Sequence, residues 1–181
     1  MPSKDFKEIF IAELISITGG LIAGATIAFY VDELLIIPGL FILIPGFLEM
    51  RNALAGSLTG RLGTALHLGS TEPKVKGNKF AMQNITASFV LSIVVALVLA
   101  TVAYIATYIF FKESSLDLFV IALLAALISN FIENAISLYT TFWLFRKGYD
   151  PDNIMGPYIT TTGDIISVLS LVVSVAVVLW V

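Results

Sequence analysis

The sequence predicts an all-α integral membrane protein, a bundle of five transmembrane helices. Of its 181 residues, 58% are hydrophobic and only 13% are charged, and the mean hydropathy is +0.97. Soluble domains carry roughly 25% charged residues, so this chain has too few charges to cover a water-soluble fold of its size. Such a composition is stable when lipid is the solvent.

Five apolar stretches are long enough for spanning helices, which need about 20 residues each. They cover residues 9–30, 34–68, 85–111, 118–145 and 154–181. The first is too long for the apolar region of a signal peptide. The second contains Pro38 and Pro45, and a polar, basic loop over 70–79 follows it. No domain-sized polar segment lies before, between or after these stretches, so we expect one five-helix domain over 1–181 without a cytoplasmic sensor domain.

Charges are distributed unequally between the two sides of this predicted bundle. With five spans, the N-terminus and the loops after the second and fourth spans share one side. That side holds Lys4, Lys7, Lys74, Lys76, Lys79, Arg146 and Lys147, with Arg51 and Arg61 in the nearer half of the second span. The opposite loops hold Asp32, Glu33, Lys112, Glu113 and Asp117. The positive-inside rule therefore predicts a multi-pass protein of the cell membrane with a cytoplasmic N-terminus and an extracellular C-terminus.

Asp164 is an acid at membrane depth. It follows the start of the last span by about ten residues, which at 1.5 Å per residue is about 15 Å, half the hydrocarbon thickness. A carboxylate there costs about 2.5–3.5 kcal/mol on insertion scales and usually has a function. Three threonines and a glycine, residues 160–163, precede it, as suits a narrow, water-filled passage. The alternative is pairing with a basic residue, for which Arg61 is the only plausible candidate.

A second polar set lies in the second and fourth spans. It consists of Glu49, Asn52, Asn130, Glu133 and Asn134. Asn130 and Asn134 are four residues apart and could share a helix face with Glu133. Hydrogen bonding between helices and a place near the pathway are both open to them. Glu49 follows Pro45–Gly46, where a helix break would free backbone carbonyls.

Glycines at G-x-x-x-G spacing predict close helix approach at two places. For Gly20 and Gly24 we expect tight packing, and for Gly56 and Gly60 a helix crossing near a symmetry axis.

The start of the last helix carries capping signals. Asp150 and Asp152 can cap its N-terminus, and Gly148 can end the helix before it. Pro157 fits the first turn if the helix begins at Gly156.

Catalysis has no candidate residues, because no nucleophile-plus-base group, phosphate-binding loop or multi-histidine metal set is present. We therefore do not expect an enzyme. The only histidine, His67, is interpreted as an interfacial hydrogen-bonding group rather than a cation ligand.

The last span resembles a known family. The stretch DPDNIMGPYITTTGD over 150–164 is similar to the last-helix motif of the MgtE-type magnesium channels and their eukaryotic solute-carrier relatives. In that family an aspartate-proline start leads through a Gly-Pro or similar pair and threonines to an aspartate inside the pore. The second span agrees at Pro45, Leu54, Leu58, Arg61, Leu62, Thr64 and Ala65. It departs where the family usually has Gly-Asn and this chain has Asn52–Ala53.

The resemblance implies a homodimer with a pore on the two-fold axis between second and fifth helices, and one Asp164 from each subunit. Hydrated Mg²⁺ would be held there as cargo, with Mn²⁺ or Co²⁺ as other candidates, and no resident cofactor is expected. The site it implies consists of Asp164, Thr160, Thr161, Asn52 and Glu49. Besides membrane lipid, divalent cations and a second copy, no partner is expected, and no nucleic acid.

Three function classes remain open at this point. The first is a magnesium channel or transporter driven by the membrane potential. The second is an exchanger that couples magnesium to sodium ions or protons. The third is a membrane subunit that transports nothing.

Overall fold

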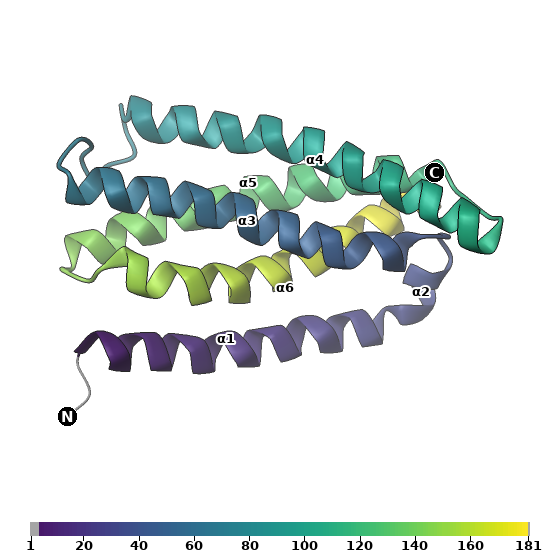
Figure 1. The fold of residues 1–181 in the computed structure, drawn as a ribbon, viewed down its shortest axis with the longest axis horizontal. Helices are drawn as coiled ribbons and strands as arrows, with labels where there is room; N and C mark the ends of the chain where they lie inside the picture. The colour runs from purple at the N-terminus through teal and green to yellow at the C-terminus, as the bar shows by residue number, and fades with distance from the viewer. Residues whose placement is uncertain (1–3, 181) are drawn as a thin grey trace.

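The computed structural model describes residues 4–180, with all side chains in that range except those of Lys4, Asp5 and Glu8. This part of the chain is all-helical, with six helices and no strand (Figure 1). The helices are α1 (Lys4–Phe29), α2 (Val31–Leu35), α3 (Leu40–His67), α4 (Lys79–Phe111), α5 (Asp117–Arg146) and α6 (Pro151–Trp180). The predicted all-α class is confirmed. The side chain of Lys4 and the predicted span end at Val181 lie outside the described residues.

Four of the described helices are long and apolar enough to cross a membrane. They are α1 over Ile9–Phe29, α4, α5 and α6. The 28-residue α3 is not among them, because polar residues such as Glu49, Arg51 and Asn52 lower its hydropathy. It nevertheless runs beside the other long helices for most of the length of the bundle (Figure 1).

The predicted second span divides into α2 and α3 at a turn. Gly39 there has φ +87°, a left-handed conformation that favours glycine, and a Cβ at this position would overlap the side chain of Thr107. From Leu40 onward α3 is unbroken, so the helix break expected after Pro45 is wrong. Pro45 lies early in the helix, where its missing N–H removes only the bond to the carbonyl of Phe41.

The core forms where α3, α4, α5 and α6 pack together, and α1 packs against α6. Small side chains let α4 approach its neighbours, since Ala96, Ala100 and Ala103 are all buried. Fourteen more apolar residues of α2, α3, α5, α6 and the turn before α3 complete the largest hydrophobic cluster around them, among them Phe47 and Leu171. This cluster lies on one side of the polar centre described below.

The expected packing of Gly20 and Gly24 is wrong within this chain. Both are exposed, and a Cβ added to either would meet nothing within 4 Å. The close approach is made one position earlier, where a Cβ on Gly19 would overlap the side chain of Thr161 on α6. Ala23, one turn after Gly19, is buried on the same side of α1.

The helix α6 begins earlier than expected. The backbone N–H of Asp152 donates to Oδ1 of Asp150 (3.0 Å), which confirms Asp150 as the cap and starts the helix at Pro151. Pro157 therefore lies inside α6 rather than in its first turn, which is a correction. Gly148, with φ +77°, follows the end of α5 as predicted.

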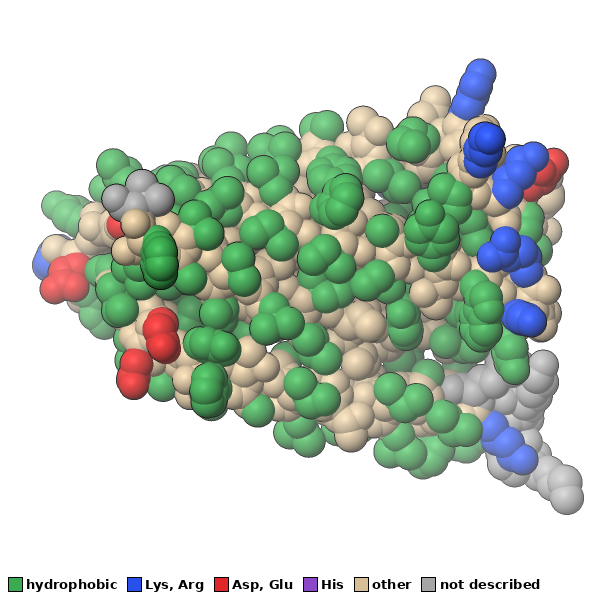
Figure 2. Space-filling model, turned by 180° about the vertical axis from the view of Figure 1, so that it is seen from behind, with side chains coloured by type: hydrophobic (Ala, Val, Ile, Leu, Met, Phe, Trp, Pro, Cys, Tyr) green, Lys and Arg blue, Asp and Glu red, His purple; other side chains and the backbone are tan. Residues whose placement is uncertain are grey.

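Charged side chains gather at the two ends of the bundle, with a hydrophobic surface between them. Figure 2 shows Lys and Arg at one end and mostly Asp and Glu at the other. The loops between α3 and α4 and between α5 and α6 lie at the same end (Figure 1). We call this the basic end and the opposite one, which holds α2 and the α4–α5 loop, the acidic end.

Candidate cation site

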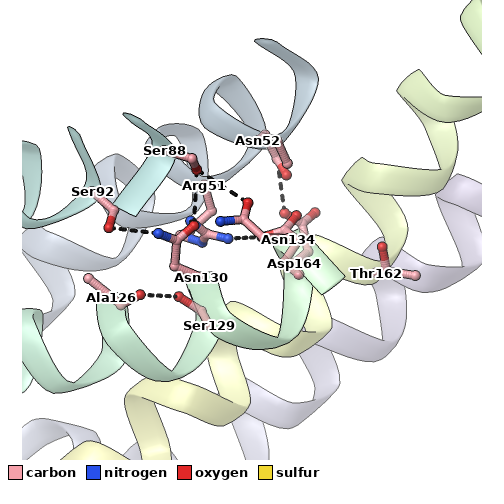
Figure 3. A network of polar contacts seen from close by, with 12 residues as sticks. Arg51, Asn52, Ser88, Ser92, Ala126, Ser129, Asn130, Asn134, Thr162 and Asp164 are labelled. Carbon is pink, nitrogen blue, oxygen red and sulfur yellow. Dashed lines mark hydrogen bonds and ion pairs between the residues drawn. The ribbon is translucent and has the colours of Figure 1, made fainter. Parts of the chain in front are cut away.

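Asp164 of α6 is half-buried and contacts α3. The side-chain Nδ2 of Asn52 donates a hydrogen bond to Oδ1 of Asp164 at 3.1 Å (Figure 3). The pairing with Arg61 weighed above does not occur, because Arg61 instead donates to Oδ1 of Asn84 on α4 (3.3 Å). Among residues 4–180 no ion pair involves Asp164, so its charge has no basic partner there.

The position of Arg51 differs from the sequence analysis, which placed this residue among the charges near the cytoplasmic side. Its side chain is fully buried and forms an ion pair with Glu133 of α5, which is also fully buried. Its Nη1 also donates to Oδ1 of Asn130 (3.0 Å). The pairing has a plain cause, since a charge buried in an apolar interior is stable only with a partner of opposite sign.

Amides and hydroxyls extend this pair into a network between α3, α4 and α5 (Figure 3). The hydroxyl of Ser88 donates to Oδ1 of Asn130 (3.1 Å) or Oδ1 of Asn134 (3.2 Å). Nδ2 of Asn130 donates to the hydroxyl of Ser92 (3.0 Å). Interhelical hydrogen bonding, one of the two possibilities for Asn130 and Asn134, is therefore observed.

Gly163 is the point at which this network meets Asp164. A Cβ at Gly163 would lie 2.6 Å from Oε1 of Glu133 and 2.9 Å from Oδ1 of Asn52. Both oxygens are buried and receive no hydrogen bond within the described structure. Two acceptors without donors beside a carboxylate form a site that attracts positive charge. Oxygen donors of this kind suit hard cations such as Mg²⁺.

Sequence analysis placed Gly163 beside Asp164 and left open whether Glu133 lies near the pathway, but it did not predict that Gly163 lets Glu133 and Asn52 approach. An arginine at membrane depth, Arg51, was the available signal, because it requires an acid on another helix. The sequence does not tell which acid pairs with Arg51 or that Gly163 makes room for that acid. Both depend on how α3, α5 and α6 converge.

A strip of small and polar residues runs along the surface where α3 and α6 meet, and we call it the α3–α6 seam. It consists of Glu49, Asn52, Gly56, Gly60, Gly156, Thr160 and Asp164, all of them exposed or half-buried. A Cβ at Gly56, Gly60 or Gly156 would meet nothing within 4 Å. The seam is therefore open along the outside of the single chain.

Four of the five predicted site residues lie on this seam, and Thr161 does not. Asp164 and Asn52 are in contact, Thr160 is one turn before Asp164, and Glu49 is exposed one turn before Asn52. The side chain of Thr161 lies against Gly19 of α1 instead.

At the basic end, His67 and Asp150 lie close to the seam. Their Nε2 and Oδ1 atoms are 3.2 Å apart, so His67 does make the hydrogen bond expected of it. With Asp152 they form an exposed group whose ligand atoms all lie within 4.8 Å of one another. A Cβ at Gly63 would overlap the Asp152 carboxylate, so the glycine makes room for it.

Known proteins match this chain over most of its length. The sequence profile of MgtE, described as a divalent cation transporter, matches residues 44–174. Solute carrier family 41 member 2 of Homo sapiens, and that of Macaca fascicularis, are each 25% identical over 131 residues, 70% of this chain and 23% of the relative. The chain thus spans less than a quarter of the length of these relatives. No solved structure matches.

Proposed function

The chain belongs to the MgtE family of divalent cation transporters, and we propose on that basis that it carries Mg²⁺ across the cell membrane as a homodimer with a central pore. Members of such a family move ions rather than transform substrates, so the proposed activity is transport, not catalysis. The observation that carries the proposal is the carboxylate of Asp164, which has an amide partner and, among the described side chains, no basic one.

The charge of the buried centre fits a divalent ion shared by two copies. Arg51 neutralises Glu133 within one chain, so Asp164 is the one uncompensated charge of the centre itself, and the exposed Glu49 adds a second acid on the seam. Two chains that meet around a two-fold axis bring two such charges together. One divalent cation neutralises both.

The α3–α6 seam gives a reason for dimerisation. Glu49, Thr160 and the open glycines would otherwise face lipid, where polar groups and unfilled grooves are unfavourable. A second copy that packs along the seam removes that contact, and glycines at Gly56 and Gly60 permit a close approach. A two-fold axis is the usual symmetry of such a self-complementary surface.

Passage through this pore would leave the magnesium ion largely hydrated. Mg²⁺ prefers six oxygens at about 2.1 Å and loses its water reluctantly. Two facing Asp164 carboxylates would hold the hydrated ion through hydrogen bonds to its water, with Thr160 and Asn52 as further contacts. Asn52 also orients Asp164 through its Nδ2. Selection would then rest on pore width and on hydrogen bonds to the hydration shell.

We also propose that α3 is the fifth span and that the basic end faces the cytoplasm. The buried pairing of Arg51 removes the main energetic objection to placing α3 in lipid. Lys and Arg at the basic end match the positive-inside rule, and the membrane potential then drives cations inward from the acidic end.

Reconstitution tests the function directly. In liposomes that contain a magnesium-sensitive dye, we expect uptake by the wild type and none by Asp164→Ala, with the dimer intact in both. Glu113→Ala, which removes an exposed loop acid, is the control and should keep the wild-type rate. Uptake at the wild-type rate by Asp164→Ala would end the proposal. Imposed sodium and proton gradients distinguish a channel from an exchanger, because only an exchanger requires one of them.

A further inference from the structure

A groove between α3 and α4 opens at the basic end and shares only Gly60 with the α3–α6 seam. Its volume is about 560 Å³, and its lining includes Arg61, Thr64, Leu68, Phe80 and Asn84. Arg61 is the only charged residue that lines it. The groove therefore combines one positive charge with an otherwise neutral wall.

The donors of this groove are largely free. Arg61 is exposed, and its one hydrogen bond within the described structure goes to Oδ1 of Asn84 at 3.3 Å, close to the upper limit for such a bond. Thr64, one turn after Arg61 on the same side of α3, has no side-chain hydrogen bond in the part of the chain that the structure describes. A guanidinium and a hydroxyl at this spacing can donate together to a phosphate.

A much smaller hollow of about 20 Å³ continues the groove toward the middle of the bundle, and half of the residues that line it are apolar. Arg61 and Asn84 line both parts, and Leu54 and Leu91 line the inner one. Leu54 precedes Arg61 on α3, and Leu91 follows Asn84 on the antiparallel α4, so these two leucines lie deeper than Arg61. A cation nearer the end and leucines farther inward follow the order in which a phospholipid of that leaflet presents its head and its chains.

We propose that this groove binds one anionic phospholipid of the leaflet at the basic end. Its phosphate lies at Arg61 and Thr64, and an acyl chain lies outside the small hollow, over the exposed surface at Leu91 and beside Leu54. The preference for an anionic lipid comes from the absence of acids in the groove and from Lys79 in the adjoining hollow at Phe80, where the one acid, Glu72, is paired with Lys74. Basic pockets between membrane helices attract such headgroups.

Native mass spectrometry of the full chain, stripped of co-purified lipid in detergent, tests this. We expect dioleoylphosphatidylglycerol to bind more tightly than dioleoylphosphatidylcholine. Arg61→Gln should weaken the phosphatidylglycerol affinity about fivefold, the value of roughly one basic contact, and remove the preference. Arg146→Gln, an exposed basic residue at the same end but outside the groove, is the matched control and should change neither.

A second variant keeps the charge of Arg61 and obstructs the acyl chain of the lipid. Ala87→Phe, placed in the inner hollow, should weaken both lipids while Arg61 stays in place. Equal binding of the two lipids by the wild type, or equal behaviour of Arg61→Gln and Arg146→Gln, overturns the proposal. The proposal is also overturned if the wild type binds no lipid and Ala87→Phe loses its dimer. That result would mean that a second copy, rather than a lipid, covers the groove. Asp164→Ala should bind lipid normally, so failure here and failure of transport are separate results.

Discussion

Asn52 and Asp164 are joined across α3 and α6 by a 3.1 Å hydrogen bond in which the amide donates to the carboxylate. The amide oxygen of the same Asn52 is buried and receives no hydrogen bond within residues 4–180. Asn52 thus fixes the acid with one end and offers a free acceptor with the other. Its contribution to transport can be measured apart from that of the acid.

Asn52→Leu should keep the helix packing but release Asp164 from its oriented position. Groups that orient metal ligands typically contribute 10–100-fold in affinity or activity, so we expect the magnesium concentration for half-maximal uptake to rise about tenfold. Liposome flux over a magnesium titration measures it. Gln83→Leu, an exposed amide on α4 outside the seam, is the control. An unchanged titration curve for Asn52→Leu would show that the bond does not matter for the ion.

The Arg51–Glu133 pair should behave as a buried ion pair. Arg51→Met or Glu133→Met alone leaves one charge unpaired and should lower the free energy of unfolding by about 3–5 kcal/mol. The double variant leaves no buried charge at this place and should recover most of the lost unfolding free energy. Unfolding of the detergent-solubilised protein provides the three values, and additive losses in the double variant would contradict the pairing. Glu72→Gln, which breaks the exposed pair with Lys74, should leave stability nearly unchanged.

Gly163 is required by its neighbours rather than by its backbone angles. In Gly163→Ala the new methyl group would lie 2.6 Å from the Glu133 carboxylate, and we expect overpacking to cost about 1–3 kcal/mol of unfolding free energy. Gly24→Ala is the matched control, because its methyl group would meet nothing within 4 Å. Removing a helical glycine there should be neutral or slightly stabilising. Equal stability of the two variants would mean that α5 and α6 are farther apart at this point.

The seam predicts a specific cross-link between copies. The chain has no cysteine, so Gly60→Cys introduces a single thiol on the seam. We expect oxidation in membranes to yield a disulfide-linked dimer. Val98→Cys, on the exposed side of α4, should stay monomeric on the same gel. The reverse pattern would place the interface on α4.

Topology depends on whether α3 crosses the membrane. Glu33→Cys, in α2, and Lys76→Cys, in the loop before α4, lie at opposite ends of α3. In intact cells a membrane-impermeant maleimide should label Glu33→Cys, and it should label Lys76→Cys only after lysis. Labelling of both from outside would reduce the spans to the four apolar helices.

Much of the fold was predictable because hydropathy and helix caps are local. The spans over 85–111 and 118–145 end within a few residues of α4 and α5, and Gly148 ends α5 as expected. The start of α6 was misjudged because Pro157 suits a first turn, whereas Asp150 caps the helix earlier. The glycines of α1 were assigned one residue out of register, since the spacing repeats equally well from Gly19 through Ala23.

The site was predictable only in part. Asp164 is evident from the sequence because placing an acid in an apolar stretch costs free energy, so such an acid usually has a function. The surroundings of Asp164 come from residues more than thirty positions away on α5 and more than a hundred away on α3, and no periodicity in one helix reports such contacts. Arg51 shows this best, since only the fold tells a solvated arginine from a buried one.

The attachment of α1 has a mechanical consequence. α1 packs against α6, and Gly19 lies directly beside Thr161, one turn before the acid of the seam. A helix in a bilayer changes its tilt when the hydrocarbon layer thins or thickens. Stretching the membrane would therefore pull on the same helix that carries Asp164, which would give lateral tension a direct route to the proposed site.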